Sequence, residues 1–200
     1  MANLLQSKWD RASRSYDWMV GAEEARFGPA KARLFQRMAG RCLMVAAGTG
    51  HDFAYFPQDL GIVAIDVSAG MLARARGRVS RYRGSLHLVQ ADVQRLGFAD
   101  QWFDTAVTVC TFCSVPDPVR GLRELRRVLR PEGRLLLFEH VRSRIAPIGW
   151  MQDLMTPITR RLGPDMNRDT LANVQRAGFH VLRETNVYLD IVKAVEAVPA

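Results

Sequence analysis

Long apolar runs are missing from this sequence of 200 residues. None approaches the roughly 20 consecutive apolar residues that a membrane-spanning helix needs. The first 18 residues carry too many charges for a secretory signal peptide. We therefore expect a soluble chain that at most lies on a membrane surface.

Cysteine is scarce as well, with only three residues: Cys42, Cys110 and Cys113. Three cysteines cannot form a disulfide framework, and the Cys110-x-x-Cys113 pair has no second cysteine or histidine pair to complete a zinc site. We therefore expect no bound metal and a cytoplasmic location, with peripheral attachment to the inner membrane face as a further option.

Lysine is almost absent, since only Lys8, Lys31 and Lys193 occur among the 28 basic residues. Acidic residues number 20, and the formal net charge is +8. Arginine binds phosphate through two parallel hydrogen bonds, so this balance favours nucleic acid or anionic lipid headgroups as partners. The alternative is an arginine-rich surface that is simply solvated.

The remaining composition is that of a folded globular protein, with 48% hydrophobic and 24% charged residues. It excludes disordered, collagen-like and low-complexity chains. We predict a single domain, 1–200, because no repeat or linker is visible. Its parts are N-terminal lid helices (1–40), a ligand-binding core (41–140), a cap (141–168), and a C-terminal helix with a hairpin (169–200).

An amphipathic helix is predicted for residues 3–20, because apolar side chains recur at steps of three and four: Leu5, Trp9, Ala12, Tyr16 and Met19. Basic side chains lie beside this stripe: Lys8, Arg11 and Arg14. Such a helix can close a site as a lid or lie in a membrane interface as an anchor. A second helix is predicted for residues 27–39.

The chain then alternates between strands and helices. Predicted strands occupy 61–66, 85–92, 103–110 and 134–140, after a first strand that begins at 41; helices occupy 71–82, 117–130 and 169–177. The segment 141–168 is predicted to be irregular because of Pro147, Pro157 and Pro164. Two last strands, 179–185 and 187–192, form an antiparallel hairpin.

This alternation predicts an α/β fold with a mainly parallel, Rossmann-like sheet of seven strands, helices on both faces and the hairpin at the C-terminal end. Ligands bind such sheets at the carboxyl ends of the strands. The turns after residues 47, 66, 92 and 110 should therefore line one site.

The strongest local signal is the run from Ala46 to Gly50, which follows a buried strand directly. Small residues let the backbone approach a ligand closely. Asp66 and Asp92 close the next two strands, where one could bind ribose hydroxyls and the other an adenine amine. The alternatives are a structural turn without a ligand, a dinucleotide site, and helix capping by the aspartates.

Four segments carry a resemblance to a known family: VAAGTGHDFAYFP (45–57), VAIDVSAGMLARAR (63–76), QADVQRLGFADQWFDTAV (90–107) and RELRRVLRPEGRLLLFEHV (123–141). They resemble the successive motifs of class I S-adenosylmethionine-dependent methyltransferases. The nearest groups are the ubiquinone/menaquinone type, bacterial phospholipid N-methyltransferases and thiol S-methyltransferases. The resemblance covers roughly residues 9–185, and it indicates cofactor and reaction more specifically than substrate.

The resemblance implies S-adenosylmethionine as the cofactor, S-adenosylhomocysteine as its product, and a role for each matching residue. The methionine part lies at Ala46, Ala47, Gly48, Thr49 and Gly50; Asp66, next to Val67, holds the ribose; Met71, Asp92 and Val93 contact the adenine; Cys110 lies beside the sulfonium; and Tyr16 closes the site.

Two departures from the family pattern stand out. Met44 occupies a position where the family has an acidic residue, and Ala46 replaces the first glycine, so weaker cofactor binding is expected. The segment 115–118 is not the Asn/Asp-Pro-Pro-Tyr motif, which argues against methylation of DNA adenine or glutamine.

Methyl transfer from a sulfonium needs mainly alignment and exclusion of water, and a base only when the nucleophile arrives protonated. The candidate bases are His140, Tyr16 and Glu139, with His140 preferred; a structural histidine at a strand end is the alternative.

The predicted cap suits an amphiphile through Trp150, Met151, Gln152, Met155 and Ile158, with Arg160 and Arg161 at its edge, although a plain covering loop would have the same composition.

We therefore predict methylation of a phospholipid headgroup amine, that of phosphatidylethanolamine, at a membrane surface. Methylation of a thiol, a quinone or another small molecule is the alternative within the same enzyme class. A non-catalytic cofactor- or RNA-binding module is the alternative from another class, and it is disfavoured because interleaved exposed aromatics are lacking. The sequence leaves the oligomeric state open.

Overall fold

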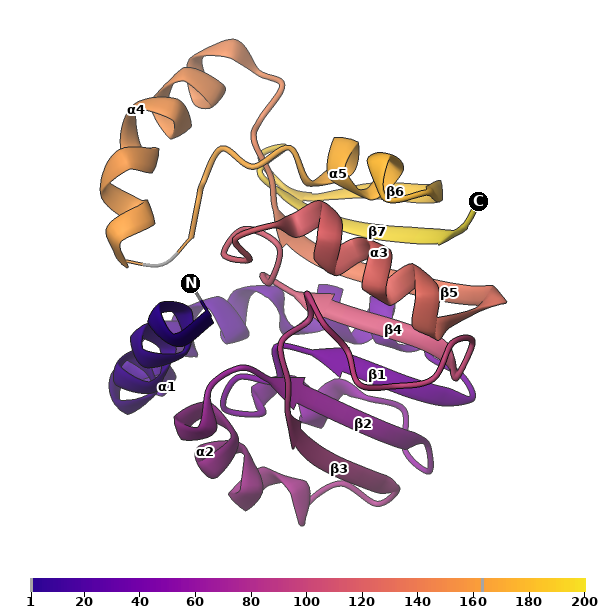
Figure 1. Cartoon of the computed structure of the whole chain (residues 1–200). Coiled ribbons are helices and arrows are strands. Elements are labelled where there is room, and N and C mark those ends of the chain that lie inside the picture. Colours follow the sequence, from indigo (N-terminus) through magenta and orange to yellow (C-terminus); the bar gives the residue numbers. More distant parts are fainter. Residues whose placement is uncertain (1, 163) are drawn as a thin grey trace.

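The computed structural model describes residues 2–162 and 164–200, and within them one seven-stranded sheet in the order β3-β2-β1-β4-β5-β7-β6 (Figure 1). The strands are β1 (Arg41–Val45), β2 (Gly61–Asp66), β3 (Ser85–Gln90), β4 (Phe103–Val109), β5 (Leu129–His140), β6 (Phe179–Tyr188) and β7 (Val192–Pro199). The Rossmann-like α/β architecture expected from the sequence is confirmed.

Strand direction divides the sheet into two parts. The pairs β1–β2, β2–β3, β1–β4 and β4–β5 are parallel, whereas β5–β7 and β6–β7 are antiparallel. The chain moves outward from β1 to β3 and then returns to β4 on the other side of β1. This reversal leaves a crevice at the carboxyl ends of β1 and β4, which is where open α/β sheets bind ligands.

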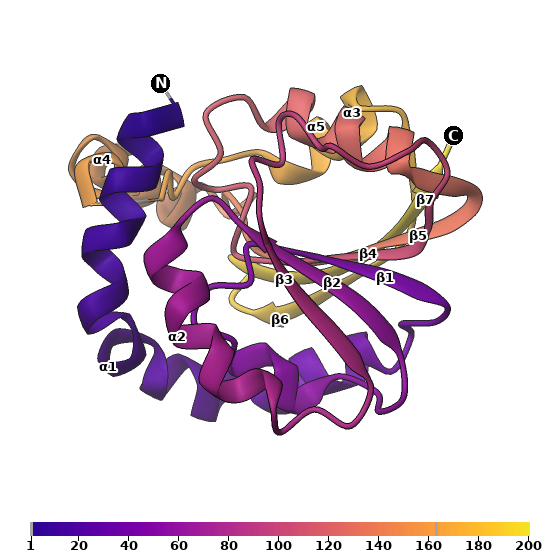
Figure 2. The ribbon, with the colours of Figure 1, turned by 60° about the horizontal axis from the view of Figure 1, so that its bottom comes forward.

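Helices cover both faces of the sheet (Figure 2). The second half of α1 (Ala2–Phe35) and α2 (Ala69–Val79) pack on one face, whereas α3 (Pro118–Val128) and α5 (Thr170–Arg176) pack on the other. Strand β1 shows why the arrangement is stable: Cys42 and Met44 lie in one core, and Leu43 and Val45 in the other. A strand that is buried on both faces must be apolar throughout.

The prediction of two separate N-terminal helices is wrong. The structure has one helix, α1, which continues through Pro29. Figure 2 shows that α1 bends, so that its first half stands beside α2 and its second half crosses beneath the sheet. The packing of Phe27 and Phe35 in the core holds the second half in place despite the proline.

The prediction of an irregular segment at 141–168 is also wrong, because α4 (Ala146–Leu162) forms there. Pro147 lies in the first turn of α4, where its missing N–H costs nothing, and Pro164 follows the end of the helix. Only Pro157 lies in the helix interior. The prolines therefore bound this helix rather than prevent it.

In the described part of the chain, no helix is long and apolar enough to cross a bilayer.

The C-terminal hairpin is confirmed, but its second strand was predicted too early, at 187–192. The structure continues β6 to Tyr188 and begins β7 at Val192. Leu189 and Asp190 form the turn with positive φ angles of 42° and 56°. No glycine marks these left-handed positions, so the sequence carried no turn signal there.

Candidate functional site

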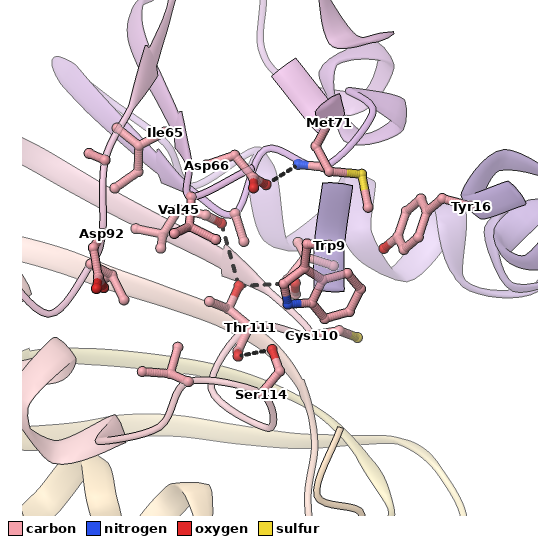
Figure 3. A pocket seen from close by; sticks show the side chains of 17 residues that line it. Trp9, Tyr16, Val45, Ile65, Asp66, Met71, Asp92, Cys110, Thr111 and Ser114 are labelled. Atoms are coloured by element: carbon pink, nitrogen blue, oxygen red, sulfur yellow. Dashed lines mark hydrogen bonds between the residues drawn. The ribbon is translucent and has the colours of Figure 1, made fainter. Parts of the chain in front are cut away.

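A cavity opens at the carboxyl ends of β1, β2 and β4, and the N-terminal half of α1 contributes to its wall (Figure 3). It encloses about 660 Å³ including the solvent at its mouth. Nine of the residues expected at the cofactor site line it: Tyr16, Ala46, Gly48, Asp66, Val67, Met71, Asp92, Val93 and Cys110. The structure therefore brings together residues from four separate turns and from the two helices α1 and α2.

Asp66 lies buried at the end of β2 and organises the floor of this cavity. Its carboxylate accepts hydrogen bonds from the backbone N–H of Gly48 at 2.9 Å and of Ser68 at 2.8 Å. Burial raises the pKa of this carboxyl group, and the two backbone donors oppose that rise. Asp66 therefore connects the small-residue turn after β1 to the start of α2.

The small-residue turn is built from left-handed backbone. Positive φ angles occur at Ala46 (56°), Gly48 (55°) and Gly50 (86°). Glycine adopts such angles freely, whereas an alanine there places its Cβ close to the following carbonyl oxygen. Ala46, which stands where the family has a glycine, is therefore strained.

Replacing Ala46 with glycine should stabilise the protein by about 1 kcal/mol, because it relieves this strain. Urea unfolding measures the change. The matched control is Ala47→Gly, at a buried neighbour whose φ is not positive, and it should lose stability. Equal effects of the two substitutions would contradict the assignment of strain to Ala46.

The remaining wall of the cavity includes residues that were not expected there: Trp9, Thr111, Ser114 and Val115. The rings of Trp9 and Tyr16 pack edge to face, with their centroids 6.3 Å apart. Both side chains therefore face the cavity. They do not form an exposed apolar stripe that could contact a membrane. Leu5 and Met19, from the same predicted stripe, lie outside the described side chains.

Two carboxylates hold the first half of α1 over the cavity. Asp10 accepts hydrogen bonds from the Ser68 hydroxyl and from the backbone N–H of Gly70, at the positive end of α2. Asp17 pairs with Arg78 at 3.0 Å and with His51 at 3.1 Å. These contacts fix the start of α1 over the cavity, at the position predicted for a lid, and this first half of α1 is called the lid below.

The surroundings of Asp17 favour its charged form. Burial opposes the charged form, but hydrogen bonds from Thr49, Arg78 and His51, together with the charge of Arg78, outweigh burial and lower the pKa of Asp17 to about 2. Asp17 therefore stays charged throughout the physiological pH range and can pair with Arg78.

A second cavity adjoins the first and shares Tyr16, Ala46, Gly48 and Cys110 with it. Ala47 and Thr49 line this second cavity, whereas Gly50 faces a separate surface hollow. The structure thus divides the predicted small-residue run among three surfaces.

Three charged residues that were not predicted as site residues also line the second cavity: Glu24, Lys31 and Asp52. Lys31 is buried and forms ion pairs with both carboxylates, the one to Asp52 at 3.0 Å. Burial disfavours the charge on Lys31, but the two carboxylates outweigh it and raise the pKa of the amine. This cluster therefore offers charges of both signs beside Cys110.

The three candidate bases occupy different positions. Tyr16 lines both cavities, whereas His140 lies behind Cys110, with its Nδ1 3.3 Å from the Cys110 Sγ. Glu139 is fully buried; its Oε1 accepts hydrogen bonds from the Thr108 hydroxyl at 3.0 Å and from the backbone N–H of Thr111 at 2.9 Å. Glu139 thus holds the turn that carries part of the cavity wall and does not line the cavity itself.

Comparison with known proteins adds family membership to this geometry. The sequence-family model described as a methyltransferase domain matches residues 43–137 of this chain. The chain is 30% identical over 164 residues to the phosphatidylethanolamine N-methyltransferase of Cereibacter sphaeroides, covering 77% of this chain and 80% of the relative. It is 35% identical over 130 residues to the demethylmenaquinone methyltransferase of Beutenbergia cavernae, covering 62% of this chain and 52% of the relative.

A ubiquinone/menaquinone biosynthesis C-methyltransferase of Vibrio cholerae is 34% identical over 125 residues, covering 58% of this chain and 47% of the relative. The chain thus spans about half the length of the quinone-methylating relatives that it matches.

Solved structures share the fold. An S-adenosylmethionine-dependent methyltransferase from Thermotoga maritima matches with a TM-score of 0.73 at 17% identity, over 98% of this chain and all of that one. Another from Mesorhizobium loti matches with a TM-score of 0.63 at 18% identity, over 88% of this chain and 99% of that one. Strand order, the cavity at the switch point and these relatives agree: this chain belongs to the class I S-adenosylmethionine-dependent methyltransferases.

Proposed function

We propose that this enzyme methylates the headgroup amine of phosphatidylethanolamine at a membrane surface. The observation that carries the proposal is the similarity to a phosphatidylethanolamine N-methyltransferase over most of both chains, whereas the quinone-methylating relatives match over about half of their length. The net charge of +8 adds a reason for attraction to anionic lipid.

The two adjoining cavities suit the two ends of S-adenosylmethionine. In the first, Met71, Asp92 and Val93 would hold the adenine, and Asp66 the ribose hydroxyls. In the second, Lys31 would face the α-carboxylate, and Glu24 with Asp52 the α-amine. These two carboxylates would supply the negative charge that Met44 cannot, although they come from α1 and from the short helix after the small-residue turn.

The cofactor supplies a methyl group on a sulfonium, whose departure leaves a neutral thioether. The protein's part is to exclude water and to aim the amine at the junction of the cavities, where Cys110 lies. Trp9 and Tyr16 on the lid would close this junction. A headgroup amine arrives protonated, so one proton must leave before the nitrogen can attack, and we propose His140 or Tyr16 as its acceptor.

Replacing His140 with phenylalanine should lower turnover on phosphatidylethanolamine about a hundredfold, with little change in cofactor affinity. Tyr16→Phe is tested in the same way. Turnover is measured with radiolabelled cofactor, and affinity by calorimetry. The matched control is His180→Phe, on exposed strand β6, which should behave as wild type. Unchanged turnover in both the His140 and Tyr16 variants would show that alignment alone is sufficient.

A substrate panel tests the proposal itself. Purified protein and labelled S-adenosylmethionine are incubated with phosphatidylethanolamine, with a demethylated quinone and with small thiols. Label in the lipid fraction as mono-, di- or trimethylated headgroup is the expected result. The quinone is the second candidate, favoured by the relatives that methylate quinones. Label in the quinone or thiol alone would overturn the lipid assignment.

A further inference from the structure

Helix α4 exposes an apolar face that nothing else in the described chain covers. Trp150, Leu154 and Ile158 are 68%, 79% and 64% exposed, and Met151 and Met155 beside them are also exposed. The spacing of four residues places the first three on one stripe of the helix, and the two methionines widen it. Contiguous exposed apolar surface of this kind marks an interaction site.

The opposite face of α4 determines which way this stripe points. Gln152 is buried and donates hydrogen bonds to the backbone carbonyls of Val141 and Met166, both at 3.0 Å. It also accepts one from the backbone N–H of Ser143 at 2.7 Å. Since Gln152 anchors the inner face to the body of the protein, the apolar stripe is held outward.

The first half of α1 lies beside α4 (Figures 1 and 2). Lys8 of α1 donates a hydrogen bond to the backbone carbonyl of Arg160, in the last turn of α4. The outer face of α1 carries Arg11, Arg14 and Trp18, all exposed and spaced three and four residues apart. Two acidic side chains of this half of α1, Asp10 and Asp17, point instead to α2 and to the short 3-10 helix His51–Tyr55.

Exposed apolar side chains on α4 and exposed arginines on α1 therefore occur on two helices that contact each other. Helices that lie in a bilayer interface bury an apolar face among the acyl chains and direct basic groups to anionic headgroups. A protein partner or a second copy of this chain would also cover apolar side chains, but the arginines of α1 match an anionic surface.

We propose that the outer face of α4 inserts into the interface of an anionic bilayer, with the arginines of α1 against the headgroups. The proposal rests on the proposed lipid substrate and deepens it. Docked in this way, the lid and the cavity behind it adjoin the membrane, so a headgroup can reach the site while its acyl chains stay among the lipids.

The test is co-sedimentation with vesicles of phosphatidylglycerol and phosphatidylcholine, compared with vesicles of phosphatidylcholine alone. Wild-type protein should bind the anionic vesicles and be released as salt is raised. The triple variant Trp150→Gln, Leu154→Gln, Ile158→Gln should bind roughly tenfold or more weakly. Because these side chains are exposed, its thermal unfolding should match that of wild type.

The matched control changes three exposed apolar residues elsewhere: Val89→Gln, Trp102→Gln and Leu182→Gln. This control should sediment as wild type does. Failure of wild type to bind anionic vesicles at low salt would overturn the proposal, as would undiminished binding by the α4 variant. A wild-type dimer that ignores vesicles and becomes monomeric in the α4 variant would assign this face to self-association instead.

Activity assays separate this proposal from the proposed substrate. The α4 variant should lose methylation of vesicle-borne phosphatidylethanolamine but keep it on a short-chain, monomerically dissolved form. Vesicle binding without methylation of either form would overturn the substrate and leave the docking face standing. Equal activity of wild type and variant on vesicles would overturn the docking face and leave the substrate standing.

Discussion

Replacing Asp66 with alanine is expected to raise the Kd for S-adenosylmethionine about thirtyfold, a loss of about 2 kcal/mol. In the proposed placement the Asp66 carboxylate accepts hydrogen bonds from ribose hydroxyls. The carboxylate also accepts hydrogen bonds from the backbone N–H groups of Gly48 and Ser68. Its removal therefore loosens the turn that shapes the cavity floor. Both effects weaken binding. Isothermal titration calorimetry measures the affinity.

Asp100→Ala provides the matched control for this experiment. Asp100 is an exposed aspartate in the loop before β4, at the opposite edge of the sheet, where it pairs with Arg127. Its removal should leave the cofactor affinity at the wild-type value. Unchanged affinity in Asp66→Ala, with the variant folded by circular dichroism, would contradict the ribose assignment and with it the whole proposed orientation of the cofactor.

The second large effect concerns Glu139 and the pH dependence of stability. Burial raises the pKa of this carboxyl group to about 7, although hydrogen bonds from Thr111, Phe112 and Thr108 oppose the rise. A raised pKa means that the folded state binds the proton more tightly than the unfolded state does. The stabilisation is therefore complete below the unfolded pKa near 4.5 and is lost as the pH rises through about 7.

Glu139→Gln should remove this dependence, since glutamine keeps an acceptor oxygen for the turn but cannot ionise. The free energy of unfolding of the variant minus that of wild type should increase by about 3 kcal/mol between pH 4.5 and pH 7. Denaturant unfolding at a series of pH values measures it. Glu132→Gln, at an exposed position of the same strand, corrects for the loss of a glutamate charge. A flat difference profile would contradict a titrating Glu139.

The same variant bears on the candidate bases. If Glu139 acts only by holding the turn from Cys110 to Ser114, Glu139→Gln should keep most of the methyl-transfer activity at pH 7. Its Oε1 accepts hydrogen bonds from Thr108 of β4 and from the backbone of this turn, and Thr111 and Ser114 of the turn line the cavity. This separates a positioning residue from His140 and Tyr16.

Much of the fold and part of the site could be predicted, because these features depend on neighbours along the chain. The continuous apolar residues of β1 require burial on both faces, whatever helices supply it. The small residues from Ala46 to Gly50 and the aspartates at the ends of strands have local signatures, and the parallel topology brings strand ends to one edge. The approximate positions of Asp66, Asp92 and Cys110 followed from this rule alone.

Other features depend on contacts between distant segments, and only the tertiary structure decided them. Lys31 is a single basic residue in a helix until folding places it between Glu24 and Asp52. Trp9 and Tyr16 belong to an apolar stripe that would suit a membrane equally well. The contacts of Asp10 and Asp17 with α2 and with the short 3-10 helix His51–Tyr55 direct both rings to the cavity.

The position of α4 shows the same division. Its prolines suggested an irregular segment, yet tertiary contacts through Gln152 support a helix and turn its apolar side outward. The sequence by itself determined the alternation of strands and helices, the burial of the central strands and the edge at which a ligand binds, because each rests on local periodicity and chain direction. Which face of α1 and α4 meets the cavity, the body or the solvent was decided only when hydrogen bonds and ion pairs between segments far apart in the chain selected one rotation of each helix.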